Sequence, residues 1–385
     1  MLEKALTGGR RYAATLGVLG LLMASGAACY ALQLRDGLTI TGLSRDVTWG
    51  LYIAQFTFLV GVAASAVMVV LPYYLHDYKA FGKITLIGEI LAIAAVSMCM
   101  LFIAADMGRP DRILNVLLHP TPHSIMFWDM LVLSGYLGLN AVIARTTLES
   151  ERRSVPPPAW MRPLVLLSIP WAVGIHTVTA FLYSGLAARP FWMTAILAPR
   201  FLASAFASGP ALLILICLLL KRVSRFDAGK EAVERLAVIA TYAMATSVFF
   251  ASVEIFTAAY SAIPEHREAF QYLFLGLDGH ARLVPWMWGA ELLALTALLL
   301  LIRPATRRRE GTLALACAAV FASIWIEKGL GMVVTAFVPS PLGKLTEYFP
   351  TLPEALIALG IYAFGAAVVL VLARVALSVR GQLAA

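Results

Sequence analysis

Long apolar stretches alternate with short polar ones along the whole chain. The apolar stretches occupy approximately residues 12–33, 50–75, 84–105, 126–145, 164–187, 201–220, 236–262, 285–302, 312–335 and 354–376. Each has about the 20 residues that an α-helix needs to cross the hydrocarbon core of a bilayer. A backbone group without a partner is costly in hydrocarbon, so each stretch must be helical. The pattern predicts an all-α membrane protein with about ten transmembrane helices.

Lysine and arginine are unequally distributed over the polar stretches. The side that holds both termini receives 20 of them, Lys4 included, and the other side receives nine, among them Arg200 in a predicted outer loop. Cytoplasmic loops are enriched in these residues. We therefore expect a multi-pass protein of the cytoplasmic (inner) membrane with both termini in the cytoplasm. The net charge of +8 is then a signal of topology, and no nucleic-acid partner is expected.

Composition excludes an ordinary soluble enzyme. Hydrophobic residues make up 61% of the chain and charged residues 14%, whereas soluble domains have roughly 45–50% and 25%. The four cysteines lie in apolar stretches without ligand-like spacing, and no phosphate-binding, dinucleotide-binding or zinc motif is present. We expect a single integral membrane domain over residues 1–385.

Several ionisable side chains fall inside the predicted spans, where a charge costs about 2.5–3.5 kcal/mol. Most of them lie in the outer half: Asp129, Glu254, Glu291, Glu327, Lys328 and Glu354, with His176 near mid-span. Only Glu89 lies in the inner half. The clustering in depth predicts a site that opens towards the outer face.

Structural alternatives remain for each of these groups. Glu327 and Lys328 are adjacent, so they point about 100° apart on a helix and need separate partners, as inter-helix ties would provide. Glu354 is expected at the membrane interface, and His176 could be a satisfied core residue. Because His176 is the only histidine deep in a span, a haem held by two histidines is not expected in this protein.

The first long outer loop, residues 106–124, carries two acids and two arginines close together. Asp106, Arg109, Asp111 and Arg112 can pair with one another there. Such pairs could also serve only as helix caps and interfacial anchors.

The spans divide into two sets that run in the same sense. We expect a first four-helix bundle over residues 50–187 and a second over 201–335, with additional helices at 12–33 and 354–376. Polar groups at matching depth in the two sets, Asp129 with Glu291 and His176 with Glu327, indicate a parallel internal repeat.

Three stretches carry a resemblance to a known family. They are MGRPDR (107–112) with PHSIMFWD (122–129), LAARPFWMTAILAPRFLASAFASG (186–209), and the segment 326–365 that begins IEKGLG. Together they resemble the NrfD/PsrC family of quinone-interacting membrane subunits, in its ten-span branch with HybB and, most similar, DsrP. Two four-helix bundles plus two helices are the fold that this resemblance implies.

The resemblance also implies partners and a ligand. Family members bind menaquinone or ubiquinone as substrate near the outer face. They exchange electrons with a periplasmic ferredoxin-like iron–sulfur subunit of a membrane redox complex, which in the DsrP branch belongs to sulfur metabolism. Asp129 and His176 match positions where the family has an acid and a histidine or other polar group. HybB-like members have Glu in place of Asp129 and lack the Glu-Lys-Gly of 327–329, which puts these roles in doubt.

Quinol oxidation releases two protons, so its site needs groups that accept them. We expect Asp129 and His176 to be the catalytic residues. The quinone-binding set is expected to comprise Trp128, His123, Tyr183, Arg189 and Trp192, and a tentative proton path to comprise Glu89, Glu254, Glu291, Glu327 and Lys328. A secondary transporter, or a proton-translocating subunit without quinone chemistry, is the alternative. A purely structural anchor is disfavoured by the number of buried charges.

Overall fold

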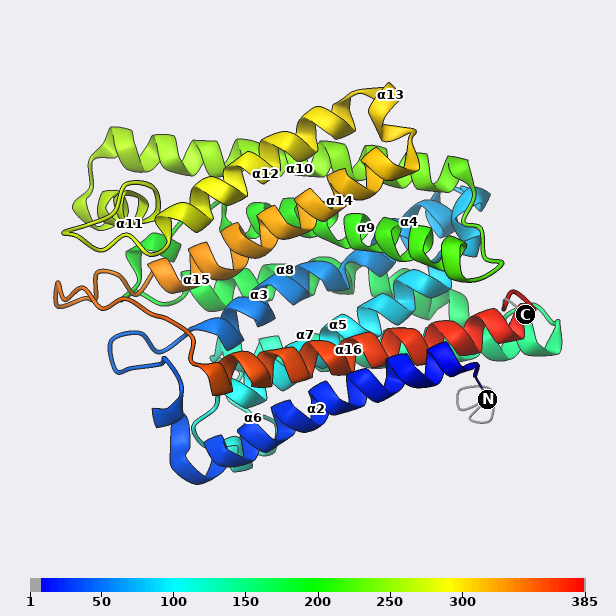
Figure 1. The fold of residues 1–385 in the computed structure, drawn as a ribbon, viewed down its shortest axis with the longest axis horizontal. Helices are drawn as coiled ribbons and strands as arrows, with labels where there is room; N and C mark the ends of the chain where they lie inside the picture. Colours follow the sequence, from blue (N-terminus) through cyan, green and yellow to red (C-terminus); the bar gives the residue numbers. More distant parts are fainter. Residues whose placement is uncertain (1–7, 384–385) are drawn as a thin grey trace.

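The computed structural model describes residues 8–383, and Lys4 lies outside this range. Ten helical segments are long and apolar enough to cross a membrane. They run roughly along one axis of an elongated bundle, with the ends of the described chain on the same side (Figure 1). The prediction of an all-α membrane protein with about ten transmembrane helices is confirmed.

The predicted spans match the observed helices to within a few residues at most ends. The spanning helices are α2 (Arg10–Asp36), α3 (Leu51–Ala63) with α4 (Ser65–Leu75), α5 (Thr85–Asp106), α7 (Ile125–Arg153), α8 (Met161–Ser184), α9 (Leu197–Val223), α10 (Lys230–Ser261), α12 (Val284–Ile302), α14 (Glu310–Ile324) continued by α15 (Met332–Thr335), and α16 (Leu352–Val379). Shorter helices are α6 (Asn115–Leu118), α11 (Pro264–Phe274) and α13 (Pro304–Arg307).

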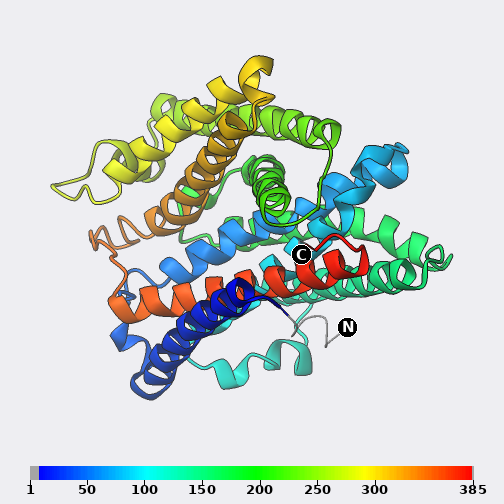
Figure 2. The same cartoon turned by 45° about the vertical axis from the view of Figure 1, so that its right-hand side comes forward.

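Helix α3 lies at the centre of the molecule. It packs against α5 on one side and against α9 on the other, and the whole of its apolar window is buried. Helices α7 and α8 pack on each other beside α5 and α9, while α10 and α14 also pack against α9 and α12 packs against both of them. Helices α2 and α16 lie side by side at the edge next to α5 (Figures 1 and 2).

Two spans depart from a regular α-helix. The second span is interrupted at Ala64, between α3 and α4, and Gly209 of α9 fits against this point because a Cβ there would lie 2.9 Å from the Ser65 nitrogen. The ninth span contains a π-helical segment, η5 (Trp325–Gly331), which packs against α3. Such segments occur frequently at functional sites.

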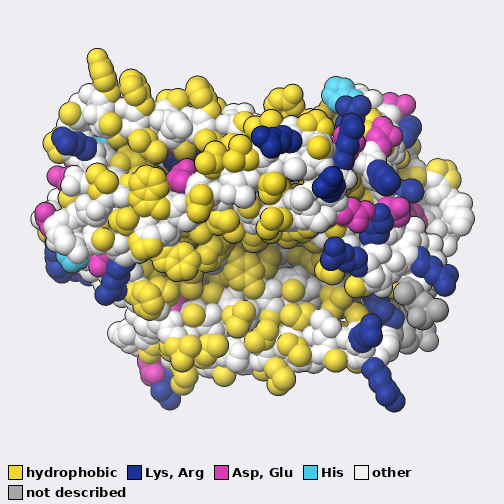
Figure 3. All heavy atoms as spheres, turned by 45° about the horizontal axis from the view of Figure 1, so that its top comes forward, with side chains coloured by type: hydrophobic (Ala, Val, Ile, Leu, Met, Phe, Trp, Pro, Cys, Tyr) yellow, Lys and Arg dark blue, Asp and Glu magenta, His cyan; other side chains and the backbone are white. Residues whose placement is uncertain are grey.

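The molecular surface is apolar around its middle. Figure 3 shows a broad belt of hydrophobic side chains, with charged side chains gathered towards the two ends. Large apolar residues such as Leu21, Tyr242 and Leu292 are mostly exposed in this belt. An exposed apolar belt of this extent requires a hydrocarbon solvent, as expected for a protein that spans a bilayer.

The end of the bundle away from the described chain ends, called the distal end below, is formed by the loops 37–50, 107–124, 185–196, 262–283 and 336–351. The end that holds the start of α2 and the end of α16 is called the terminal end. In the distal loop 107–124, the Nε and one terminal nitrogen of Arg109 donate to Asp111 at 3.0 Å. Asp106 does not join this pair, so the predicted pairing of all four charges of the loop is confirmed for these two residues alone.

Candidate functional site

A buried polar cluster joins α7 and α8 in the distal half of the bundle. His176, Thr179 and Tyr183 lie three and four residues apart along α8, a spacing that places them on one face of a helix. That face is buried. Thr179 donates a hydrogen bond of 2.7 Å to the buried carboxylate of Asp129 on α7. The helix periodicity thus places His176 on the same face of α8 as Thr179, which binds Asp129.

His176 has no hydrogen-bond partner among residues 8–383. Its side chain is completely buried, yet neither ring nitrogen donates or accepts a hydrogen bond within that range. Lys328 lies close enough to act on the imidazole electrostatically. Buried polar groups in folded proteins nearly always have partners, so an orphaned imidazole needs a specific explanation. A ligand with a hydroxyl or carbonyl oxygen would satisfy it.

An aromatic cluster lies next to these polar groups, around Tyr183. The Tyr183 hydroxyl is hydrogen bonded to Thr57 of α3. Its ring meets Trp192 edge-on with ring centres 4.9 Å apart, and Trp49 stacks on Trp192 at 5.5 Å. The Trp192 indole donates to the Met332 carbonyl at 2.8 Å, which fixes its orientation.

Arg189 belongs to the distal loop that carries Trp192. Its guanidinium carbon lies 4.2 Å from the centre of the Phe337 ring. One terminal nitrogen is buried without a hydrogen-bond partner in residues 8–383, and burial lowers the pKa of this guanidinium. Arg189 is thus a partly desolvated cation beside the aromatic cluster.

A cavity of about 380 Å³ opens beside the same loop. Its wall includes Pro190 and Phe191 of the loop, Thr335 at the end of α15, and Glu265 and Glu268 of α11. Small-molecule sites have volumes of roughly 300–1,000 Å³ and mostly apolar walls. The cavity is therefore large enough to admit a planar ring. Its wall adjoins the loop that carries Trp192 but includes none of Trp192, Tyr183 and His176.

Two members of the expected quinone-binding set lie outside these clusters. Trp128 is 45% exposed, and its indole donates to the Pro122 carbonyl at 2.8 Å. His123 is exposed in the same distal loop. Trp128 precedes the buried Asp129 but points about 100° away from it around α7, so adjacency in sequence does not make them neighbours in space.

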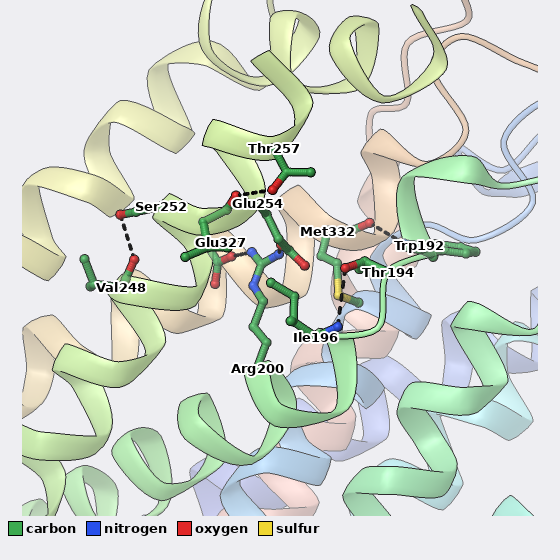
Figure 4. Close-up of polar contacts among 11 residues, drawn as sticks. Trp192, Thr194, Ile196, Arg200, Val248, Ser252, Glu254, Thr257, Glu327 and Met332 are labelled. Atoms are coloured by element: carbon green, nitrogen blue, oxygen red, sulfur yellow. Dashed lines mark hydrogen bonds and ion pairs between the residues drawn. The ribbon is translucent and has the colours of Figure 1, made fainter. Parts of the chain in front are cut away.

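A second cluster forms around Arg200, where α9, α10 and η5 meet. The guanidinium pairs with Glu254 through one nitrogen and with Glu327 through another, and all three side chains are largely buried. Figure 4 shows Arg200 reaching between the two carboxylates. The prediction that Arg200 lies in an outer loop is wrong, because α9 begins at Leu197 and encloses it within the bundle.

Glu291 of α12 lies at the same place. Together with Arg200 and Glu327 it lines a narrow cavity of about 10 Å³, roughly the room for one water. Three of the acids in the expected proton path thus converge on a single arginine. The cluster is polar and narrow, so it suits a proton or a water molecule and not an organic ring.

Lys328 follows Glu327 directly but points to the other side of η5. Its ammonium lies 4.2 Å from the centre of the Phe201 ring and 3.5 Å from the Phe201 carbonyl oxygen, and the side chain is buried. The expectation that these neighbours need separate partners is confirmed. The segment η5 therefore directs one charge towards Arg200 and the other towards the α3–α9 interface.

The remaining acids lie apart from both clusters. Glu89 is buried one turn into α5 at the terminal end, with one carboxylate oxygen lacking a partner in residues 8–383. Glu354 stands in the first turn of α16 at the distal end, as predicted, but it is completely buried and accepts a hydrogen bond from the Gly42 amide at 2.9 Å. It closes a capping box with Thr351, which gives it a structural role.

Sequence reasoning missed several residues of these clusters. Trp49 precedes the second span, and Thr57 is an uncharged residue inside it. Nothing in the local pattern separates them from other small polar or interfacial residues. Arg200 carried a usable signal, since the apolar residues Leu197 and Ala198 precede it and show that the span begins earlier.

Comparison with known proteins agrees with this architecture. The sequence is 27% identical to that of a putative membrane subunit of dimethyl sulfoxide reductase from Halobacterium salinarum, over 92% of this protein and 89% of that one. It is 26% identical to the Hdr-like menaquinol oxidoreductase integral membrane subunit of Archaeoglobus fulgidus, over 69% of this protein and 65% of the relative. A polysulfide reductase polypeptide of Wolinella succinogenes is 25% identical over 46% of this protein and 60% of its own length.

A family model, polysulphide reductase NrfD, matches residues 39–333. The matched region begins before α3 and ends in α15, so it contains the Asp129–His176 cluster, the aromatic cluster and the Arg200 cluster. Because the match extends over well more than half of the sequence, this protein belongs to the NrfD family of reductase membrane subunits.

Proposed function

We propose that this protein is the quinone-binding membrane subunit of a respiratory electron-transfer complex. The observation that supports this most directly is the unpartnered, fully buried imidazole of His176, which shares the buried face of α8 with Thr179 and Tyr183. A quinone ring carries two oxygen atoms that can hydrogen bond as carbonyls or hydroxyls, which is the chemistry that an orphaned imidazole lacks. Relatives named as menaquinol oxidoreductase and polysulfide reductase components support the same function.

In this proposal Asp129 and His176 bind the ring oxygens and hold the protons that accompany electron transfer. Thr179 donates to Asp129 and keeps its carboxylate turned towards α8. Trp49, Tyr183 and Trp192 exclude water and offer flat apolar surfaces to the ring. A positioned acid or base contributes about 10²–10⁴-fold to a proton-transfer step.

The partner in this proposal is a ferredoxin-like iron–sulfur subunit that docks at the distal end. The distal end then faces the periplasm, and both termini face the cytoplasm, in agreement with the excess of basic residues at the terminal end. Menaquinone and ubiquinone both fit the proposal, as does a DsrP-like role in sulfur metabolism. Two four-helix units, residues 50–187 and 201–335, form the proposed domain organisation.

We propose a proton path through the second cluster as part of the same function. Glu254, Glu291 and Glu327 surround Arg200, and Lys328 extends the charged groups towards His176. Glu89 would lie at the terminal-end exit. A proton-translocating subunit without quinone chemistry is the second candidate, and the Arg200 cluster is the observation that favours it.

An Asp129→Asn variant tests the first proposal. The amide keeps the shape of the carboxylate but cannot accept a proton, so we expect quinol-dependent electron transfer in membranes to fall about 100-fold or more. Asp111→Asn is the matched control, because Asp111 is an exposed acid of the distal end that pairs with Arg109. Normal quinol turnover by Asp129→Asn, with both variants inserted at equal levels, would remove Asp129 from the reaction.

A further inference from the structure

A second cavity lies at the opposite end of the molecule from the proposed quinone site. It has a volume of about 260 Å³ and opens between the end of α9, the start of α10, α13 and the start of α14. Figure 3 shows basic and acidic side chains crowded at this end, on the right of the view. The cavity contributes to none of the clusters described above.

The rim of this cavity carries more cations than acids: Lys221, Lys230, Arg307 and Arg308 against Asp227, Glu234 and Glu310. Glu310 accepts from Lys221 at 2.7 Å. Glu234 accepts from Arg308 at 2.8 Å, and Asp227 accepts from the Gly229 amide at 3.0 Å. Two cations of the rim, Lys230 and Arg307, make no ion pair with a residue in the range 8–383.

Arg307 carries an unsatisfied donor at this rim. One of its terminal nitrogens donates to the Leu301 carbonyl at 2.9 Å, but its Nε is enclosed and has no hydrogen-bond partner in the described part of the chain. A buried donor of a charged group that lacks an acceptor is costly. An anionic oxygen in the cavity would supply that acceptor.

Two helices begin at the same cavity. Helix α10 has 32 residues and starts at Lys230, and α14 has 15 residues and starts at Glu310. Neither has a side-chain hydrogen bond at its N-cap. The free amides and partial positive charge of a helix N-terminus favour an anion such as phosphate.

The wall of the cavity towards the middle of the bundle is apolar. Leu218 lies one turn before Lys221 on α9, Val233 one turn after Lys230 on α10, and Leu313 one turn after Glu310 on α14. An apolar wall below a basic rim matches an amphiphile that has a phosphate head and acyl chains. Free phosphate shares the chemistry of the head group but has no acyl chains to contact the apolar wall.

We propose that this cavity binds the phosphate head group of an anionic phospholipid, with Lys230, Arg307 and the two helix N-termini as its contacts. Binding here joins α9, α10 and α14 at the terminal end. The site is independent of the quinone chemistry proposed above.

Native mass spectrometry of the full-length protein in detergent tests this proposal. The protein is titrated with phosphatidylglycerol, with phosphatidylcholine, and with phosphatidylglycerol in the presence of inorganic phosphate. We expect preferential retention of phosphatidylglycerol that phosphate does not displace. Because each basic side chain near an anionic lipid contributes about fivefold, Lys230→Gln should weaken binding about fivefold and Lys230→Gln/Arg307→Gln about 25-fold.

The matched control removes a lysine and an arginine from the same end but outside the cavity. Lys83→Gln/Arg162→Gln fits, since both side chains are exposed and neither lines the cavity. This control should retain phosphatidylglycerol as the unmodified protein does. Equal losses in control and cavity variants, equal retention of the two lipids, or displacement by inorganic phosphate would each overturn the proposal. If the double variant does not fold, Lys230→Gln alone tests the proposal, because Lys230 is exposed.

Discussion

Buried polar side chains need hydrogen bonds that replace those they would make with water. Asp129 has such a bond from the Thr179 hydroxyl, and Tyr183 has one with Thr57. His176 has none with residues 8–383. At the scale of single residues, this difference is the basis of the proposal that His176 binds a ligand.

A His176→Leu variant tests that distinction. Replacing an unsatisfied buried polar group by an apolar one of similar size is neutral or stabilising, so the melting temperature in detergent should stay the same or rise. Quinol oxidation should nevertheless fall about 100-fold or more. Thr177→Val on the exposed side of α8 serves as the control and should change neither quantity. A strongly lowered melting temperature for His176→Leu would instead assign the imidazole a structural role.

Arg200 offers a second test at the residue scale. Removing it in Arg200→Gln leaves Glu254 and Glu327 buried without their partner, and breaking a buried ion pair in this way costs about 3–5 kcal/mol. We expect a clear fall in thermal stability, which Arg200→Gln/Glu254→Gln/Glu327→Gln should largely restore. Arg112→Gln, in the exposed distal loop, is the control. Unchanged stability of Arg200→Gln would contradict the ion-pair geometry.

The sequence predicts how deep a residue lies in the membrane better than it predicts which residues surround it. Asp129, His176 and Lys328 could be placed inside spans because distance along an apolar stretch is a one-dimensional quantity. The partners of Asp129 and Lys328 could not, since Thr179 and Phe201 belong to other helices whose rotation about their axes is set by packing. Trp128 shows the same limit of sequence-based prediction. It directly precedes Asp129 in sequence, but it is exposed and lies outside the cluster.

At the scale of helices, close approach depends on glycine. Gly26 of α2 faces Gly360 of α16, and a Cβ on Gly26 would lie 2.9 Å from the Gly360 Cα. The two helices therefore contact each other almost backbone to backbone along this line. Helix pairs in membranes use small residues in the same way, because packing replaces the hydrophobic effect there.

A Gly26→Val variant should separate these helices. Overpacking of a tight contact costs about 1–3 kcal/mol, so we expect a lower melting temperature in detergent. Gly20→Val on the same helix is the matched control, since a Cβ at Gly20 meets no atom within 4 Å. The two variants share the same change in helix propensity, and equal melting temperatures would contradict the α2–α16 contact.

The lengths of the helices could be predicted from the sequence, but the irregular segments within them could not. The interruption at Ala64 and the π-helical segment η5 lie in apolar stretches that read as continuous. Both coincide with tertiary contacts: Gly209 packs at the interruption, and Glu327 and Lys328 of η5 have different partners. The sequence shows that two adjacent charges need separate partners. It does not show that a π-helical segment provides them.

At the scale of the whole molecule, α3 and η5 connect the two regions that carry polar chemistry. Gln55 of α3 accepts hydrogen bonds of 2.6 Å from Trp325 of η5 and from Tyr362 of α16. Thr57, half a turn further along α3, reaches Tyr183. The proposed quinone site and the Arg200 cluster therefore share one rigid central helix, which gives a physical route for one to influence the other.

In the function proposed here, a quinone binds at the distal end near α8 and the loop 185–196. Photolabelling of membranes with an azidoquinone, followed by peptide mapping, tests this binding most directly. We predict label on α8 and on the loop 185–196, lost in His176→Leu and in the presence of excess natural quinone. Label confined to α10, α12 or the terminal end, or label that His176→Leu leaves unchanged, would contradict the account.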